Sequence, residues 1–173
     1  MAVDSVRGLK HFDLLEKGDI TGMLEKSNRD IVAYGDDNLE YENMATTLTG
    51  IYFNISGQIL FHVGNTRAYL FSGDYLTCCT KDHTAIQEAK DAHQSIEDIP
   101  SNIITACMGG GNELSMKDYL VVENIEAYLT NGNMLMLTSD GIHDYVTDDE
   151  IKAVYGQVKN REFSRNKDLK DML

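Results

Sequence analysis

The sequence predicts an α+β fold in which antiparallel strands occupy the middle of the chain and helices lie toward its two ends. Three observations lead to this prediction. Apolar residues recur at helical spacing near the N-terminus, short β-branched and aromatic segments follow one another from Thr46, and a helix-start motif begins at Thr147. Strands that follow one another directly favour antiparallel pairing, because a parallel sheet needs strands that alternate with helices.

The first helix is predicted over residues 19–34. Asp19 is a suitable N-cap, and apolar residues at helical spacing follow it from Ile20 to Val32. Residues 2–15 are also expected to be helical. The motif Thr-x-x-Glu at Thr147 is a capping box, so a last helix is expected to run from there toward residue 160.

The central strands are predicted from short apolar segments separated by turn-forming residues such as Ser-Gly and Gly-Asn. The first group forms a meander over residues 46–54, 58–64, 67–73 and 75–79. A short helix is expected over 84–93, and further strands over 102–107, 118–128 and 133–140. Residues 134–138, MLMLT, have no polar face, so we expect this strand to be covered on both sides.

Length and composition fit a single globular domain over residues 1–173, since the chain has 173 residues, 42% of them hydrophobic, and one proline. No apolar stretch reaches the roughly 18 residues of a membrane helix, and no signal-peptide pattern opens the chain, so no membrane association and a cytoplasmic location are expected. The three cysteines show neither a disulfide framework nor a zinc spacing. The net charge of -13 argues against binding to nucleic acid.

The strongest candidate for chemistry is Asp140, which follows the apolar strand directly and precedes Gly141. A carboxylate at the end of a rigid strand, next to a residue that lets the backbone turn closely, suits Mg²⁺ or Mn²⁺. The alternative is that Asp140 caps the short helix that starts near Ile142.

Four stretches, in order, resemble the metal-dependent protein serine/threonine phosphatases of type 2C: MATTLTG (44–50), HVGNTRAYLF (62–71), LTCCTKDHT (76–84) and MLMLTSDGIHDYVTDDEI (134–151). A fifth, NIITACMGGG (102–111), resembles the segment before the variable flap of that family. The resemblance implies an αββα sandwich, that is, two antiparallel sheets packed face to face with helices outside each.

The resemblance also implies a role for the aspartate of Ser-Asp-Gly, which is a metal ligand in this family and is matched here by Asp140, with Gly141 as the adjacent turn. In such a site two Mg or Mn ions, about 3.5–4 Å apart, polarise the phosphoryl group and generate the attacking hydroxide. The expected substrates are phosphoserine and phosphothreonine on proteins. No residue of this chain is assigned a separate catalytic role.

The sequence departs from the family pattern at three places. The early Asp-Gly-x-Gly-Gly segment and the closing Asp-Asn are absent, so the fold is expected to be incomplete at both ends. Asn65 stands where many members carry an aspartate for a third metal; it keeps a carbonyl oxygen but loses the charge, and it also suits a turn. Arg67 is expected to pair across strands, His62 to be a core or cross-strand residue, and His83 to lie at the start of a helix capped by Thr84 or Asp82.

Two hypotheses follow from these features. In the first, the chain is the central part of a type 2C phosphatase and is nearly inactive alone, because one carboxylate cannot hold two Mg²⁺ ions. In the second, it is a catalytically dead phosphatase-like module that binds or regulates other proteins. In both cases strands missing from a sandwich leave exposed edges, so self-association through such edges is expected.

Overall fold

The computed structural model describes residues 15–54, 57–110, 116, 118–125 and 132–171. It contains two three-stranded antiparallel sheets and a small two-stranded one. The first sheet has the order β2-β3-β7, with β2 Leu48–Asn54, β3 Gly57–Val63 and β7 Val121–Asn124. The second has the order β5-β4-β8, with β4 Arg67–Ser72, β5 Tyr75–Cys78 and β8 Met134–Thr138. β1 Ala45–Thr46 pairs with β6 Met108–Gly109.

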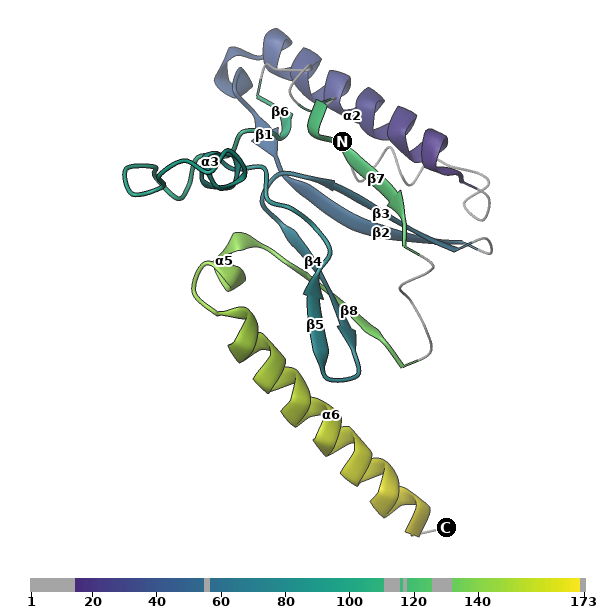
Figure 1. The fold of residues 1–173 in the computed structure, drawn as a ribbon. Helices are drawn as coiled ribbons and strands as arrows, with labels where there is room; N and C mark the ends of the chain where they lie inside the picture. The colour runs from purple at the N-terminus through teal and green to yellow at the C-terminus, as the bar shows by residue number, and fades with distance from the viewer. Residues whose placement is uncertain (1–14, 55–56, 111–115, 117, 126–131, 172–173) are drawn as a thin grey trace.

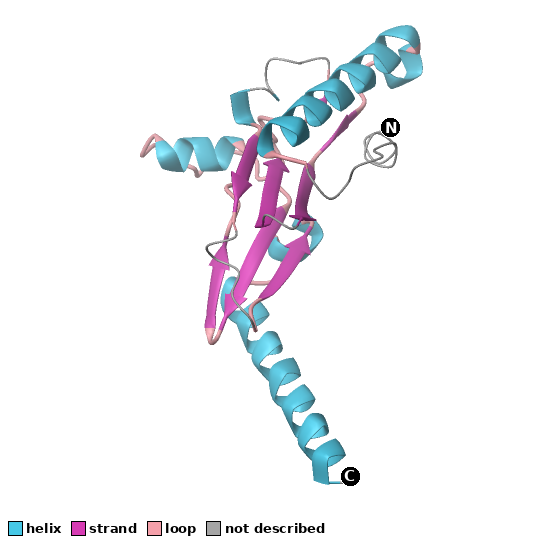
Figure 2. Ribbon diagram, turned by 90° about the vertical axis from the view of Figure 1, so that its right-hand side faces the viewer, coloured by secondary structure: helices cyan, strands magenta, loops and turns pink. Residues whose placement is uncertain are grey.

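The helices are α2 Lys17–Asp37, the 3-10 helix η2 Leu39–Tyr41, α3 Ala85–Asp91, α5 Asp140–His143 and α6 Asp148–Asp171. The two long ones lie on the outer faces of the sheets, α2 over β2-β3-β7 and α6 over β5-β4-β8, as Figures 1 and 2 show. The C-terminal half of α6 projects past the ends of the strands. No helix in the described part of the chain is both long and apolar enough to cross a membrane.

Successive side chains of a strand point to opposite faces of its sheet, so each strand contributes residues to two layers. On β3, Ile59 packs with Leu24 of α2, whereas its neighbour Leu60 packs with Ala68 of β4 between the sheets. On β4, Ala68 faces that interior, whereas Tyr69 packs in a cluster with Ile151 of α6. This order of helix, sheet, sheet and helix is the predicted αββα sandwich, and the α+β class is confirmed.

The four strands predicted over residues 46–79 form as β2 to β5, but the single meander is wrong: β2 and β3 make one hairpin and β4 and β5 another, and the two hairpins lie in different sheets. α2 covers the expected residues 19–34, and α3 forms within the expected 84–93. α2 begins two residues before Asp19, which is not its N-cap: Glu16 is the N-cap, and Asp19 accepts from the Glu16 backbone N–H at 2.8 Å in a capping box. The capping box at Thr147 is confirmed, since Glu150 accepts from the Thr147 N–H at 2.9 Å and its own N–H donates to Thr147 Oγ1 at 3.3 Å.

Two strand predictions need correction. Residues 102–107 do not form a strand; within them Ile104 makes only an isolated bridge to Thr84. β8 forms as expected but is not covered on both sides, because it lies at the end of its sheet and Leu137 remains 49% exposed. The predicted helix over 2–15 lies almost wholly outside the described residues, and a single domain over 1–173 stays a prediction.

Candidate functional site

The β4–β8 register brings the two predicted site residues together. Arg67 pairs with Thr138 at the end of this antiparallel ladder. Continuing the ladder by two positions places Asn65, in the turn before β4, opposite Asp140, which follows β8. Their side chains meet there, because Asn65 Nδ2 donates to Asp140 Oδ2 at 3.1 Å across 75 residues of sequence.

Asp140 is exposed, and both of its carboxylate oxygens accept one N–H group. Oδ2 accepts from Asn65, and Oδ1 accepts from the backbone N–H of Gly141 at 2.8 Å. The residue opens α5, whose N-cap is Ser139, so the carboxylate is not the N-cap but lies in the first helical turn. A negative charge is favourable at that position because the first amides of a helix point toward it.

Asn65 is buried, with 8% of its surface exposed, and its position depends on the preceding glycine. Gly64 has φ +108°, a conformation that side chains rarely adopt, and a Cβ at this position would lie 2.4 Å from Thr47 Cγ2. The turn is therefore built around a residue without a side chain. Its backbone is also held from outside, because the Gly64 N–H donates to His83 Nδ1 at 3.0 Å and the His83 N–H donates to the Gly64 carbonyl at 2.8 Å.

His83 and His62 are two buried imidazoles next to this turn, with ring centres 4.8 Å apart and ring planes tilted by 37° to each other. His62 Nε2 donates to the Lys81 carbonyl at 2.9 Å, and its Nδ1 lies 2.7 Å from the Thr49 hydroxyl. Burial lowers the pKa of His83 to about 4, with a further contribution from His62, and burial also lowers the pKa of His62. Both rings are therefore neutral at pH 7. The core position expected for His62 is confirmed, and so is a helix start after His83, with Thr84 as its N-cap.

Arg67 was expected to pair across strands, and this prediction is wrong. Its side chain pairs instead with a loop residue that follows β5. Its guanidinium holds Asp82 through two bonds, from Nε at 2.8 Å and from Nη2 at 2.6 Å, and Nη1 donates to the Tyr69 hydroxyl at 3.2 Å. The bonds to Asp82 raise the pKa of Arg67, so the group stays charged. The Tyr69 hydroxyl in turn donates to Asp148 at the start of α6 at 3.1 Å. This network connects β4 to the loop after β5 and to the start of α6, and it keeps the guanidinium bound to Asp82.

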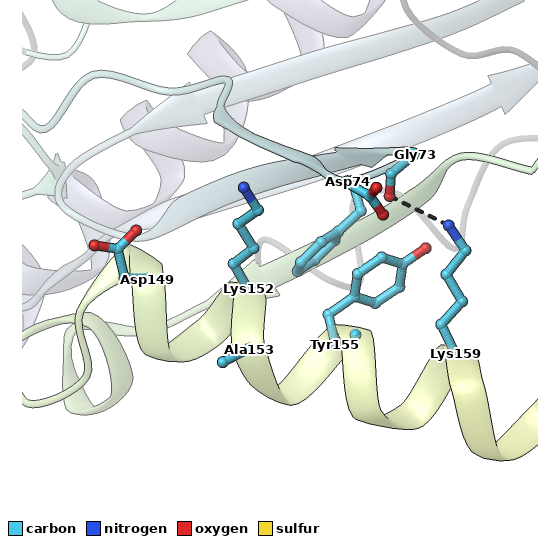
Figure 3. A pocket seen from close by; sticks show the side chains of 9 residues that line it. Gly73, Asp74, Asp149, Lys152, Ala153, Tyr155 and Lys159 are labelled. Carbon is cyan, nitrogen blue, oxygen red and sulfur yellow. Dashed lines mark hydrogen bonds between the residues drawn. The ribbon is translucent and has the colours of Figure 1, made fainter.

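One hollow lies elsewhere, between the β4–β5 turn and α6 (Figure 3). It has a volume of about 370 Å³ and is lined by Phe71, Tyr155 and two lysines, among others. Neither Asp140 nor Asn65 belongs to its lining. Within the described part of the chain, no group of three or more His, Cys, Asp or Glu side chains could hold a metal ion.

Sequence reasoning found Asp140, Gly141 and Asn65, but it did not find the bond between two of them or the support from His83. The Gly-Asn turn and the Ser-Asp-Gly turn are both visible as local patterns. Their meeting depends on which strands pair and in which register, and no local pattern carries that information. The three polar residues Lys-Asp-His at 81–83 were a usable signal, since functional side chains are often carried by loops.

Comparison with known proteins identifies relatives that are similar in sequence. No family model matches the sequence. The protein phosphatase PhpP of Streptococcus pneumoniae is 30% identical over 136 residues, which are 76% of this chain and 52% of the relative. A putative protein phosphatase of type 2C from Streptococcus pyogenes is 27% identical over 138 residues, which are 77% of this chain and 53% of the relative. The chain therefore spans about half the length of the curated relatives it matches.

Among solved structures, the catalytic domain of the serine threonine protein phosphatase PstP, in complex with 2 manganese ions, matches with a TM-score of 0.72 at 25% identity. The match covers 88% of this chain and 64% of that chain. In fold, this chain therefore matches serine/threonine phosphatases. In sequence, it is similar to protein phosphatases of type 2C, in agreement with the resemblance of its motifs.

Proposed function

We propose that this chain is part of a metal-dependent enzyme that hydrolyses phosphoserine and phosphothreonine on proteins, and that Asp140 is a ligand for Mg²⁺ or Mn²⁺. The observation that carries the proposal is an exposed carboxylate at the end of β8, held by two N–H groups. The substrate class is supported by the relatives, which are named serine/threonine or type 2C protein phosphatases. A cytoplasmic location and a role in signalling stay predictions.

The chemistry of Asp140 fits one divalent ion. Each carboxylate oxygen accepts a single N–H, so each keeps a second lone-pair direction for a cation. Mg²⁺ in proteins is commonly held by one or two carboxylates and completes its six ligands with water. Rotation of the Asn65 amide by half a turn would add a carbonyl oxygen on the same side. Two ions need more carboxylates than the described residues bring together, so further ligands would have to come from other residues.

A bound divalent ion would polarise a phosphoryl group and lower the pKa of water, which is the chemistry that the family reaction needs. The residues around Asp140 would hold its carboxylate in place for the ion. The register of β4 with β8 sets the position of Asp140, and Asn65 limits its rotation through the 3.1 Å bond. Arg67 would not bind the phosphate, because its guanidinium is occupied by Asp82.

The proposal predicts weak metal binding and little turnover for the isolated chain. Mn²⁺ binding is measured by electron paramagnetic resonance, and hydrolysis of a small aryl phosphate is measured with Mn²⁺ present. We expect binding to be lost in Asp140→Ala and kept in Asp149→Ala, which removes an exposed carboxylate at the start of α6. Equal Mn²⁺ binding by Asp140→Ala and the native chain would disprove the ligand role. Robust turnover that Asp140→Ala abolishes would disprove the expected inactivity.

The second candidate is a phosphatase-like interaction module without catalysis. It is favoured by Asn65, because an amide N–H there already occupies one oxygen of Asp140. Sequencing the coding region on both sides of the present chain separates the two candidates. An in-frame Asp-Gly-x-Gly-Gly upstream and an Asp-Asn downstream favour the enzyme, whereas stop codons on both sides favour the module.

A further inference from the structure

The loop after β5, residues 81–83, is attached at each of its three positions to the segment 62–67, which carries Asn65. The attachments are the Lys81 carbonyl to His62, the Asp82 carboxylate to Arg67 and His83 to Gly64. They hold this segment before, within and after the turn between β3 and β4. One loop therefore supports the turn from which the Asn65 amide reaches Asp140.

His83 makes two bonds to Gly64, and they act on different peptide groups. Its Nδ1 accepts the Gly64 N–H at 3.0 Å, which belongs to the peptide group before Gly64. Its backbone N–H donates to the Gly64 carbonyl at 2.8 Å, which belongs to the peptide group that joins Gly64 to Asn65. Peptide groups are planar, so holding the group on each side of Gly64 restricts both of its backbone dihedral angles.

Gly64 needs this outside support because glycine has little conformational preference of its own. The turn requires its φ of +108°, which a residue with a side chain rarely adopts. The same freedom that permits this φ also permits many other values. The two bonds to His83 select one of them. Because Asn65 follows directly in the chain, the direction of its side chain depends on that selection.

The residue after Asn65 is held independently of His83. Thr49 Oγ1 lies 2.6 Å from Thr66 Oγ1 and 2.7 Å from His62 Nδ1. His62 Nε2 carries a proton, since it donates to a carbonyl, so its Nδ1 accepts the hydroxyl proton of Thr49. Thr49 has no second proton, and the Thr66 hydroxyl is therefore the donor between the two threonines. Loss of the acceptor at His83 would free the turn on one side only.

We propose that His83 is a positioning residue for Asp140 and acts through the turn. It fixes Gly64, and the fixed turn directs the Asn65 amide to the carboxylate, where Nδ2 donates to Oδ2 at 3.1 Å. The consequence for a metal ion rests on the proposed function, in which Asp140 is the ligand. Residues that orient metal ligands commonly contribute about 10- to 100-fold to metal affinity. His83 acts through two intervening residues, so we expect the lower end, about tenfold.

The first measurement is nuclear magnetic resonance of the Asn65 side-chain amide in the metal-free full chain, assigned by its absence in Asn65→Ser. His83→Leu fills the buried site without an acceptor, and His83→Asn keeps an acceptor. We expect the Asn65 amide signals to move toward those of an amide without a partner in His83→Leu and to stay near the native values in His83→Asn. Both variants remove the imidazole, so equal shifts in the two would reflect the lost ring and overturn the proposal. Native signals in His83→Leu would overturn it as well.

Asn28→Leu is the matched control for a general loss of stability. Asn28 Oδ1 accepts the N–H of Gly109 at 2.7 Å, a buried bond to a glycine that, like Gly64, has positive φ. This variant removes the same kind of bond where α2 meets β6. We expect a lower melting temperature in both leucine variants and altered Asn65 amide signals in His83→Leu alone. Equal changes of these signals in both variants would mean a loosened fold and would overturn the proposal.

A second substitution covers the case in which His83→Leu does not fold. In His83→Gln the longer side chain displaces the acceptor from Gly64, so the Asn65 amide signals should move in the same direction as expected for His83→Leu. Native signals in a folded His83→Gln, together with native signals in His83→Asn, would overturn the proposal.

The second measurement is Mn²⁺ affinity by electron paramagnetic resonance. His83→Leu should bind about tenfold more weakly than the native chain, whereas His83→Asn and Asn28→Leu should bind like it. Equal affinity of His83→Leu and the native chain would overturn the positioning role. No Mn²⁺ binding by the native chain, together with the expected amide signals, would disprove the ligand role of Asp140 and support the positioning of Asn65. The two proposals can therefore fail separately.

Discussion

Replacing His83 with asparagine should flatten the pH dependence of stability between pH 7 and pH 5. The imidazole is buried and accepts the Gly64 N–H at Nδ1, so its Nδ1 has no room for a proton without losing that bond. Asparagine places an amide oxygen close to the position of Nδ1 and does not titrate in this range. It therefore keeps an acceptor for the turn while removing the ionisation.

The magnitude follows from the pKa of His83, which falls from its usual 6.5 to about 4 on folding. As the pH drops below 6.5, the unfolded chain binds a proton at this site and the folded chain does not. Stability therefore decreases as the pH falls, and the decrease ends near pH 4, where the folded form binds the proton too. Between pH 7 and pH 5 the loss is about 2 kcal/mol. The lowered pKa of His62 acts in the same direction.

The assay is urea denaturation followed by circular dichroism at pH 7, 6 and 5. The native chain should lose at least about 2 kcal/mol of unfolding free energy over this range, and His83→Asn should lose about 2 kcal/mol less than the native chain. His93→Asn is the matched control because His93 is exposed at the end of α3, and it should behave like the native chain. If His83→Asn and the native chain lose the same free energy, the buried imidazole is not the cause and the reasoning is refuted.

Three further substitutions test the site and its supports. Asn65→Asp places a second carboxylate beside Asp140, so it should raise the Mn²⁺ affinity on the order of tenfold, measured by calorimetry, and lower the melting temperature when no metal is present. Asp82→Asn leaves the partly buried Arg67 without its charged partner and should cost about 2–3 kcal/mol of unfolding free energy in urea. Gly64→Ala puts a Cβ 2.4 Å from a neighbouring side-chain atom at positive φ and should cost about 2–3 kcal/mol in the same assay.

Asp82→Asn and Gly64→Ala each have a control on the same chain. Asp91→Asn removes an exposed partner of Lys81 and should leave the unfolding free energy nearly unchanged, because surface ion pairs contribute little. Gly22→Ala lies in α2 with open space around its Cβ and should not destabilise the fold. Equal costs for Asp82→Asn and Asp91→Asn would mean that the Arg67 network contributes no more than a surface pair. An unchanged Mn²⁺ affinity in Asn65→Asp would place the metal, if bound, away from this turn.

The sequence predicted the elements that depend on local patterns and missed those that depend on neighbours. Short β-branched and aromatic segments between turn-forming residues identified β2 to β5, and the Thr-x-x-Glu motif located the start of α6, because each signal lies within a few residues of sequence. The apolar run of β8 was interpreted as burial on both faces. Burial depends on which strand lies beside it, and the described residues supply only one. Likewise, the loop over 102–107 is apolar enough for a strand but finds only one bridging partner at Thr84.

The candidate site also combines features that local patterns predict with features that depend on tertiary neighbours. Asp140 and Asn65 could each be identified from a turn motif, but the 3.1 Å bond between them is a product of tertiary structure. His83 was interpreted as a residue that precedes a helix, which is correct, and its role as the acceptor for Gly64 became clear only with the loop folded back on the turn.

Arg67 of β4 pairs with Thr138 of β8, so the 70 residues between them form a closed excursion, that is, a segment whose two ends lie side by side in the same strand pair. Lengthening or shortening that excursion in one of its exposed loops, such as residues 93–98, would leave Asp140 opposite Asn65. A single residue inserted within β8 would have the reverse effect: every later side chain would exchange faces, and the carboxylate would turn away from the amide. Natural variation in length is therefore expected inside the excursion and not at its two ends.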